Sequence, residues 1–282
     1  MKKQIALILL LLSFSSCGGN NQTTPNNTAN KTPSNESAVT EPNTTSTPGE
    51  SKTSSLPSSF SKYFSGTLGE KNTIQMRITR KDKDLSGFYL YEKIGMGIPF
   101  LGKIDDKGNV EITEYTYVTN YEGKIDPGEK TGSFKGILAN NKIEGTWTNP
   151  KGDKTLPFSI VLQEPIKEKL TGTWYITDKK SGFNIDLIQE GDKIKGAACA
   201  VIDDGRKIDC LSEDAKNDPN IEGTVTDNIA TVTFQSSFDM ESKGTATIAL
   251  TNSGLIWDVI QEPTGESYIF SHCLMKKRNE KK

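Results

Sequence analysis

The chain has 282 residues, with 34 Lys and Arg against 36 Asp and Glu and a net charge of -2. This balance supplies no basic surface, so nucleic acid is excluded from the expected partners. Only one histidine is present, His272, which excludes a histidine-rich metal cage by count, and we expect neither a metal nor a cofactor.

The chain begins with MKKQIALILLLLSFSSC, in which two lysines precede a short apolar run. This run cannot cross the about 30 Å hydrocarbon core of a bilayer, so residues 1–16 are interpreted as a signal peptide. The closing SSC resembles the bacterial lipoprotein box, although Phe14 stands where leucine is usual. The resemblance implies that Cys17 carries acyl chains such as palmitate, which anchor the protein to a membrane. The alternative is an ordinary secretory signal with a cysteine in this place.

The segment after Cys17 is rich in Asn, Thr, Ser and Pro and has few apolar residues as far as residue 58. Such a segment buries too little apolar surface to offset its ordering entropy, so residues 17–58 are predicted to be a disordered tether. A flexible coil of this length spans about 35 Å. Glycine rather than aspartate follows Cys17. By resemblance to enterobacterial sorting, this residue implies the outer membrane, and either the periplasmic or the surface face of that membrane is compatible with it.

Beyond the tether, apolar residues recur at every second position in short runs. Residues 73–79, 183–188, 230–237 and 245–250 show this period of two, which predicts half-buried strands. Turn signals separate such runs nearly every 8–12 residues, as is typical of an all-β sandwich or barrel. These signals lie at 105–109, 140–141, 149–153, 203–205 and 226–228.

Glycine recurs inside the predicted strands, for example in FSGTL (64–68), IEGTW (143–147) and IEGTV (221–225). Glycine weakens a strand unless strong bending requires it, so the repetition favours barrels over flat sandwiches. A charged run around Pro165 divides the pattern into 59–164 and 165–282, with about eight strands in each, enough to close a barrel. The sequence therefore predicts an all-β fold of two tandem antiparallel up-and-down β-barrels.

The segment LTGTWYITDKKSGFNIDLIQEGDKIKG (170–196) resembles the first three strands of the calycin superfamily, most closely the avidin group. The resemblance implies that Trp174 plugs one end of a small barrel and that Gly172 lets the chain pass beneath it. It does not imply biotin binding, because Ile176 stands where avidins have an asparagine that holds the ureido group. The stacking tryptophans of avidins are also missing, since the chain has only three tryptophans.

The segment CAVIDDGRKIDC (199–210) predicts a disulfide-bonded hairpin. With Asp204-Gly205 as a two-residue turn, Cys199 falls opposite Cys210, and export to an oxidising compartment would permit the bond. Cys273 is the remaining thiol and is the alternative partner for either cysteine.

Aromatic residues concentrate in the first half and suggest a ligand-binding mouth for an apolar molecule or a sugar ring. The candidate residues are Tyr89, Tyr91, Tyr115, Tyr117, Trp147 and Trp174. Ordinary barrel core is the simpler interpretation of the same residues, and His272 is expected to be an exposed or edge residue.

Three functions are compatible with this pattern. The first is a non-catalytic envelope lipoprotein that binds a small apolar or amphipathic ligand, or a partner, through its barrels. The second is an inhibitor or shielding protein that blocks a lytic enzyme or host factor through a long polar loop at 115–130. The third is a glycan-acting enzyme with paired carboxylates, for which Glu111 with Glu114 and Asp203, Asp204 and Asp209 are the nearby candidates. We expect the first, and expect no catalytic residue.

Overall fold

The computed structural model describes residues 57–119 and 125–278 of the chain. By its internal contacts the chain divides into Met1–Glu50 and Ser51–Lys282, and every described residue belongs to the second unit. The predicted signal peptide, Cys17 and nearly all of the predicted tether lie outside the described residues. Within the described ranges, no helix is long and apolar enough to cross a membrane.

The described residues form strands joined by turns and short loops. The strands are β1 (Ser59–Leu68), β2 (Asn72–Lys81), β3 (Asp84–Tyr91), β4 (Gly97–Ile104), β5 (Asn109–Thr119), β6 (Ile125–Ala139), β7 (Lys142–Thr148), β8 (Thr155–Gln163), β9 (Gly172–Thr177), β10 (Gly182–Glu190), β11 (Lys193–Ile202), β12 (Lys207–Cys210), β13 (Ile221–Thr226), β14 (Ile229–Phe234), β15 (Gly244–Thr251), β16 (Gly254–Gln261) and β17 (His272–Lys277).

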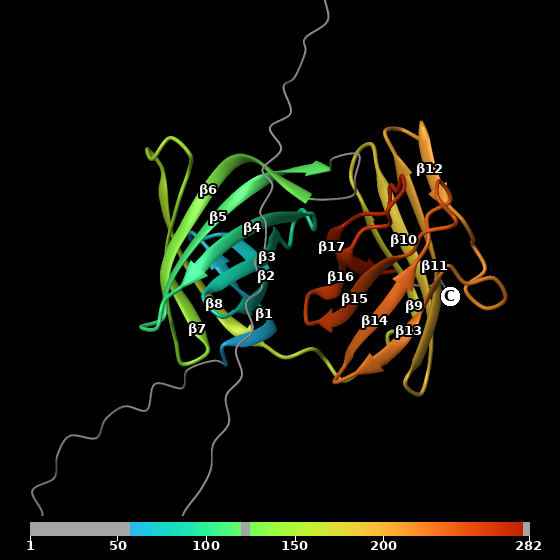
Figure 1. Ribbon diagram of the computed structural model, residues 1–282, viewed down its shortest axis with the longest axis horizontal. Coiled ribbons are helices and arrows are strands. Elements are labelled where there is room, and N and C mark those ends of the chain that lie inside the picture. The colour runs from blue at the N-terminus through green and yellow to red at the C-terminus, as the bar shows by residue number, and fades with distance from the viewer. Residues whose placement is uncertain (1–56, 120–124, 279–282) are drawn as a thin grey trace, which may run out of the picture. The chain divides into compact units, whose positions relative to one another are not determined.

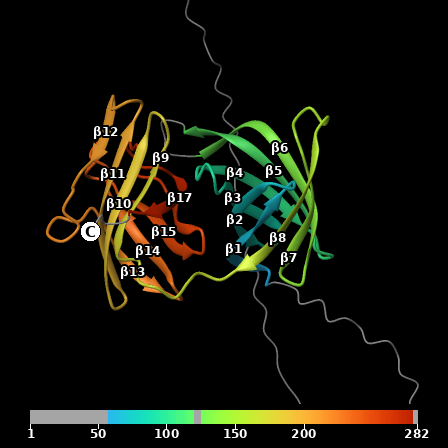
Figure 2. The ribbon, with the colours of Figure 1, turned by 180° about the vertical axis from the view of Figure 1, so that it is seen from behind.

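The strands β1 to β8 form a closed barrel in which each strand pairs antiparallel with the next along the chain (Figure 1). The barrel closes where β1 pairs with β8 over Tyr63–Leu68. The second barrel has the ring order β10-β9-β17-β16-β15-β14-β13-β11 and closes through β10 and β11, with β12 added at the edge of β11. The prediction of two tandem up-and-down barrels is confirmed, and Figure 2 shows the connection from β8 to β9 that joins them.

The period-two pattern places the apolar side chains inside the barrels as predicted. In β2, Ile74, Met76 and Ile78 are buried in the core of the first barrel. In β10, Phe183, Ile185 and Leu187 are buried in the core of the second. Aromatic rings pack together in this second interior, where Phe183 and Phe234 both make edge contacts with Trp257.

The strand glycines occupy positions where neighbouring backbones approach too closely for a side chain. A Cβ at Gly66 would overlap the carbonyl oxygen of Ser159 on the paired strand β8, and one at Gly223 would overlap that of Thr231 on β14. This supports the interpretation that these glycines allow strong bending of the strands.

The prediction of a long polar loop at 115–130 is wrong for most of that range. Tyr115–Thr119 continue β5, and Ile125–Lys130 open β6, so that only 120–124 remain, and these lie outside the described residues. Two register irregularities near Tyr115 accompany the pairing of these strand ends. Alternating threonines and tyrosines sustain a strand here, although the segment is polar enough to suggest a loop.

Candidate functional site

The two barrels contact each other through the outer faces of their strands. An apolar cluster joins Tyr63, Phe88 and Leu90 of the first barrel to Ala249, Ile256 and Leu274 of the second. Beside it, an isolated β-bridge links Met96 to Cys273, and the Leu274 amide donates to the Gly95 carbonyl at 2.8 Å. Residues that face solvent in a lone barrel are therefore buried here.

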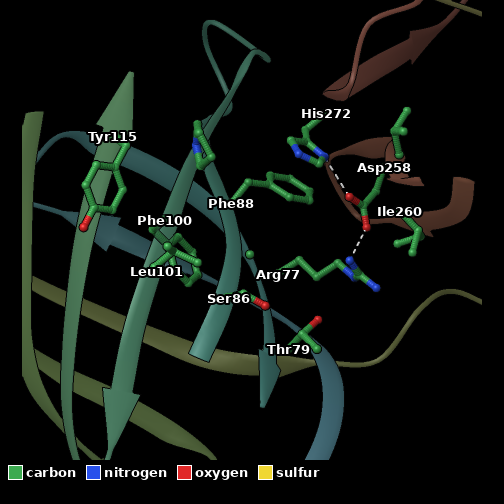
Figure 3. A pocket seen from close by; sticks show the side chains of 13 residues that line it. Arg77, Thr79, Ser86, Phe88, Phe100, Leu101, Tyr115, Asp258, Ile260 and His272 are labelled. Atoms are coloured by element: carbon green, nitrogen blue, oxygen red, sulfur yellow. Dashed lines mark ion pairs between the residues drawn. The ribbon is translucent and has the colours of Figure 1, made fainter. Parts of the chain in front are cut away.

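A buried charged group lies within this contact and combines residues of both barrels. Asp258 of β16, only 1 % exposed, forms an ion pair with Arg77 of β2. His272 of β17 places Nδ1 2.7 Å from Asp258 Oδ1, and its ring stacks on Phe88 with centroids 4.6 Å apart. Figure 3 shows Arg77 and His272 both pointing at Asp258. Burial, reinforced by the Asp258 charge, raises the pKa of nearby Tyr63 to about 12.

A pocket of about 350 Å³ opens beside this charged group. Its walls are mostly apolar, and Leu101 and Ile260 stay 48 % and 52 % exposed at its lining. Figure 3 shows the labelled lining side chains arriving from both barrels. The lining comprises Arg77, Thr79, Ser86, Gly87, Phe88, Pro99, Phe100, Leu101, Tyr115, Asp258, Val259, Ile260 and His272.

The pocket combines apolar walls with a small set of converging polar groups, the usual composition of a small-molecule site. The Arg77 guanidinium carries several N–H donors in one plane, and its ion pair with Asp258 engages Nη1. The hydroxyls of Thr79 and Ser86 line the same space. This arrangement suits a molecule with an apolar body and a head group that accepts hydrogen bonds.

The predicted aromatic residues do not form one mouth. Tyr115 lines the pocket between the barrels, whereas Tyr89, Tyr91 and Trp147 belong to the interior of the first barrel. Trp174 is buried in the second barrel, where its Nε1 donates to the Leu170 carbonyl at 2.9 Å. The side chain of Tyr117 lies outside the described residues. Period-two alternation assigns a residue to a face, but it cannot assign it to the end of a barrel or to a contact between barrels.

Inside the first barrel, Glu114 forms a polar centre that the sequence marked only as half of a carboxylate pair. Its Oε2 accepts hydrogen bonds from Tyr89 Oη at 2.5 Å and from Trp147 Nε1 at 3.1 Å. Glu111 instead lies exposed and ion-paired with Lys135. Residues three apart on a strand point to opposite faces, so Glu111 and Glu114 are not the facing pair that glycan hydrolysis needs.

The other acidic candidates have structural roles at the β11–β12 hairpin. Asp203 and Asp204 adopt positive φ in the turn. Asp209 is buried, and it accepts hydrogen bonds from the hydroxyls of Ser236 and Ser237 and from the backbone amides of Ser237 and Tyr268. The carboxylate thus ties the hairpin to two later loops.

The cysteine prediction is confirmed: Cys199 pairs opposite Cys210 in register, and the two form a disulfide. The alternative that Cys273 captures either partner is wrong, since Cys273 is a buried free thiol on β17. Burial, followed by the charge of Asp258, raises the pKa of this thiol well above its usual range.

The sequence did not reveal the charged group at the barrel contact. His272, expected at an exposed or edge position, is instead mostly buried, with its side chain 9 % exposed, because β17 lies against β3 and β4 of the first barrel. One signal was available: Asp258 interrupts GLIWDVIQ, a strand apolar on both faces, which indicates burial on both sides. Arg77 in the alternating strand β2 carries no such signal, because an outward arginine is ordinary there.

No model of a known protein family matches the chain, and no curated protein matches it either. Among the described residues, no group of three or more His, Cys, Asp or Glu side chains is arranged to hold a metal ion.

Proposed function

We propose that this protein is a lipid-anchored, non-catalytic protein of the bacterial cell envelope that binds a small amphipathic molecule between its two barrels. The single observation that supports binding is the pocket with apolar walls and a charged floor, to which both barrels contribute. The calycin-like opening of the second barrel and the lipoprotein-like end of the leader agree with a tethered binding protein, most simply at the outer membrane.

The proposed ligand follows from the two parts of the pocket. Its apolar portion packs on Phe88, Pro99, Leu101 and Ile260, and its head group accepts hydrogen bonds from Arg77. Contact with the exposed Leu101 and Ile260 removes apolar surface from water, at about 25 cal/mol for each Å². A medium-chain carboxylate has both features and is a suitable probe.

Binding is tested by titrating dodecanoate into the protein below its micelle concentration, with isothermal calorimetry as the readout. We expect saturable one-to-one binding that weakens at least about tenfold in Leu101→Glu, since a charge then occupies an apolar wall. Ile137→Glu is the matched control, because Ile137 is a comparably exposed residue of the same barrel that does not line the pocket.

Native mass spectrometry of protein purified from its own host provides a second readout, through any retained small molecule. Absence of a retained molecule together with no saturable binding of dodecanoate would refute the proposal. Equal weakening by Leu101→Glu and Ile137→Glu would show that the molecule binds elsewhere, and would refute the assignment of the pocket.

A second candidate function is the blocking of a lytic enzyme or a host factor through a projecting element. It is favoured by the ends of β5 and β6, which pair with each other beyond the point where β4 and β7 stop pairing with them. The β4–β5 pairing ends at Glu114 and the β6–β7 pairing begins at Ser133, whereas β5 pairs with β6 as far as Thr119 and Ile125. Deletion of 116–128 should abolish such inhibition while leaving dodecanoate binding intact.

A further inference from the structure

The first barrel contains a buried carboxylate whose partners are all neutral. Glu114 is 3 % exposed, and its two hydrogen-bond donors are the Tyr89 hydroxyl and the Trp147 indole. Both donors bond Oε2, and within the described ranges no side chain donates to Oε1 or forms an ion pair with this carboxylate. A buried carboxylate is costly unless it is paired with a positive charge, so the site favours a cation that the described side chains do not supply.

The surroundings of Glu114 are aromatic and lie toward one rim of the barrel. Odd-numbered strands of an up-and-down barrel run in the same direction, so β3 and β7 end at the same rim. Tyr91 is the last residue of β3, and Trp147 is the last but one of β7. The Tyr89 ring makes edge contacts with Tyr91 and with Phe134, at centroid distances of 5.7 and 5.2 Å.

A glycine on β6, Gly132, leaves room for the Glu114 carboxylate and the Trp147 indole. A Cβ at Gly132 would overlap Glu114 Oε1 and would lie 2.6 Å from Trp147 Nε1. Any other residue at this position would displace both groups. The backbone of β6 at Gly132 therefore leaves space for the carboxylate, and Tyr89 and Trp147 hold it in place by hydrogen bonds.

The chemistry of this centre distinguishes between kinds of cation. A calcium or magnesium ion needs about six or more oxygen ligands, and the described residues offer no group of acidic side chains arranged for a metal. Aromatic rings attract organic ammonium groups through their π faces and pack against the attached carbons. One carboxylate among tyrosine and tryptophan rings therefore suits an organic ammonium ion.

We propose that the rim of the first barrel binds the ammonium group of a small organic cation, with its charge paired to Glu114 and its carbon atoms packed on Tyr91 and Trp147. This site is separate from the pocket between the barrels and does not depend on it. The ammonium group can belong to a free amine or to a lipid head group, since both present the same charge and the same methyl or methylene carbons.

The test compares choline with 3,3-dimethylbutan-1-ol, its uncharged analogue of the same shape, by calorimetric titration of the folded chain. We expect saturable binding of choline and at least about tenfold weaker binding of the alcohol, because the alcohol lacks the positive charge that the rings and the carboxylate attract. Phosphatidylcholine vesicles are titrated in parallel, so that binding of choline alone assigns a free organic cation and binding of vesicles alone assigns a lipid head group.

Three variants locate the site. Glu114→Gln keeps acceptors for Tyr89 and Trp147 but removes the charge, so it should lose at least about tenfold in affinity. Tyr91→Leu removes a ring at the rim without touching the carboxylate and should lose about fivefold. Glu111→Gln, an exposed position on the same strand, should bind as the parent does.

The proposal is overturned if neither choline nor the vesicles bind saturably, or if Glu114→Gln binds the probe as tightly as the parent. Equal affinity for choline and its uncharged analogue would also overturn it. Dodecanoate binding is measured on the same variants and should be unchanged, which keeps the outcome for this site separate from that for the pocket.

Discussion

Removal of Asp258 provides the sharpest test of how the two barrels are held together. In Asp258→Ala, Arg77 and His272 lose the carboxylate that both of them face. The Thr247 hydroxyl, which donates to Asp258 Oδ2 at 3.3 Å, loses its acceptor as well. The variant therefore removes the acceptor that faces the Arg77 guanidinium and the Thr247 hydroxyl inside a mostly buried contact.

The expected loss follows from this burial. Deletion of one partner of a buried ion pair costs about 3–5 kcal/mol, because the remaining charge stays uncompensated. The Arg77 side chain is 14 % exposed and so keeps some access to water, which places the expected loss near the lower end, at about 3 kcal/mol. For a protein of this size that loss lowers Tm by about 6–12 °C.

The assay is urea denaturation followed by circular dichroism and tryptophan fluorescence. Asp84→Ala is the control, since Asp84 is in an exposed ion pair with Lys103 and should change the free energy of unfolding by less than about 0.5 kcal/mol. The double variant Arg77→Met, Asp258→Leu replaces the pair by apolar side chains and should recover most of the loss. If Asp258→Ala is within about 1 kcal/mol of the parent, the group does not stabilise the contact as argued.

Three further outcomes follow from the second barrel. Replacing Cys199 and Cys210 by alanine should lower its free energy of unfolding by about 3 kcal/mol, as urea titration would show, because the short closed loop no longer restricts the unfolded chain. Native protein should resist alkylation by iodoacetamide at pH 8, because Cys273 is buried and its raised pKa keeps the thiol protonated; rapid labelling measured by mass spectrometry would contradict this. Burial raises the pKa of Glu262 in the folded protein above its ordinary 4.5. The neutral carboxyl therefore favours the folded state, and this stability is fully present below pH 4.5 and is lost as the pH rises through the pKa of the folded protein. Glu262→Gln should therefore be more stable than the parent at pH 8 and equal to it at pH 4 in thermal melts.

The architecture of the chain was predictable because each local signal agreed with the global fold. Period-two runs such as the one containing Ile74, Met76 and Ile78 fix which side chains enter a barrel, and the strand glycines indicate where neighbouring backbones crowd. The hairpin register that brings Cys199 opposite Cys210 follows from turn chemistry alone. These properties depend on residues that are close together in the chain, so they can be inferred directly from the sequence.

The candidate sites were less predictable because they depend on contacts between distant segments. Arg77 and Asp258 lie on strands of different barrels, and nothing local to Arg77 distinguishes it from an outward arginine in water. Glu114 has an inward position by alternation, but its pairing with Tyr89 and Trp147 depends on three strands and on the space left by Gly132. The aromatic pattern marked Tyr89 and Trp147 as ligand-binding candidates, but it gave no sign that both of them bond Glu114.

For the exported protein that we propose, the position of the unpaired thiol Cys273 has a consequence for disulfide formation in an oxidising compartment. If the chain is exported as proposed, Cys199 and Cys210, which are close in sequence, would leave the export channel well before Cys273, so their bond could close while the Cys273 thiol is still absent. Cys273 follows on the last strand, and closure of the barrel then shields it from oxidants and from exchange. This order of emergence would protect the correct pairing, and refolding of a reduced chain in which Cys199, Cys210 and Cys273 compete at once should yield more mispaired product than export.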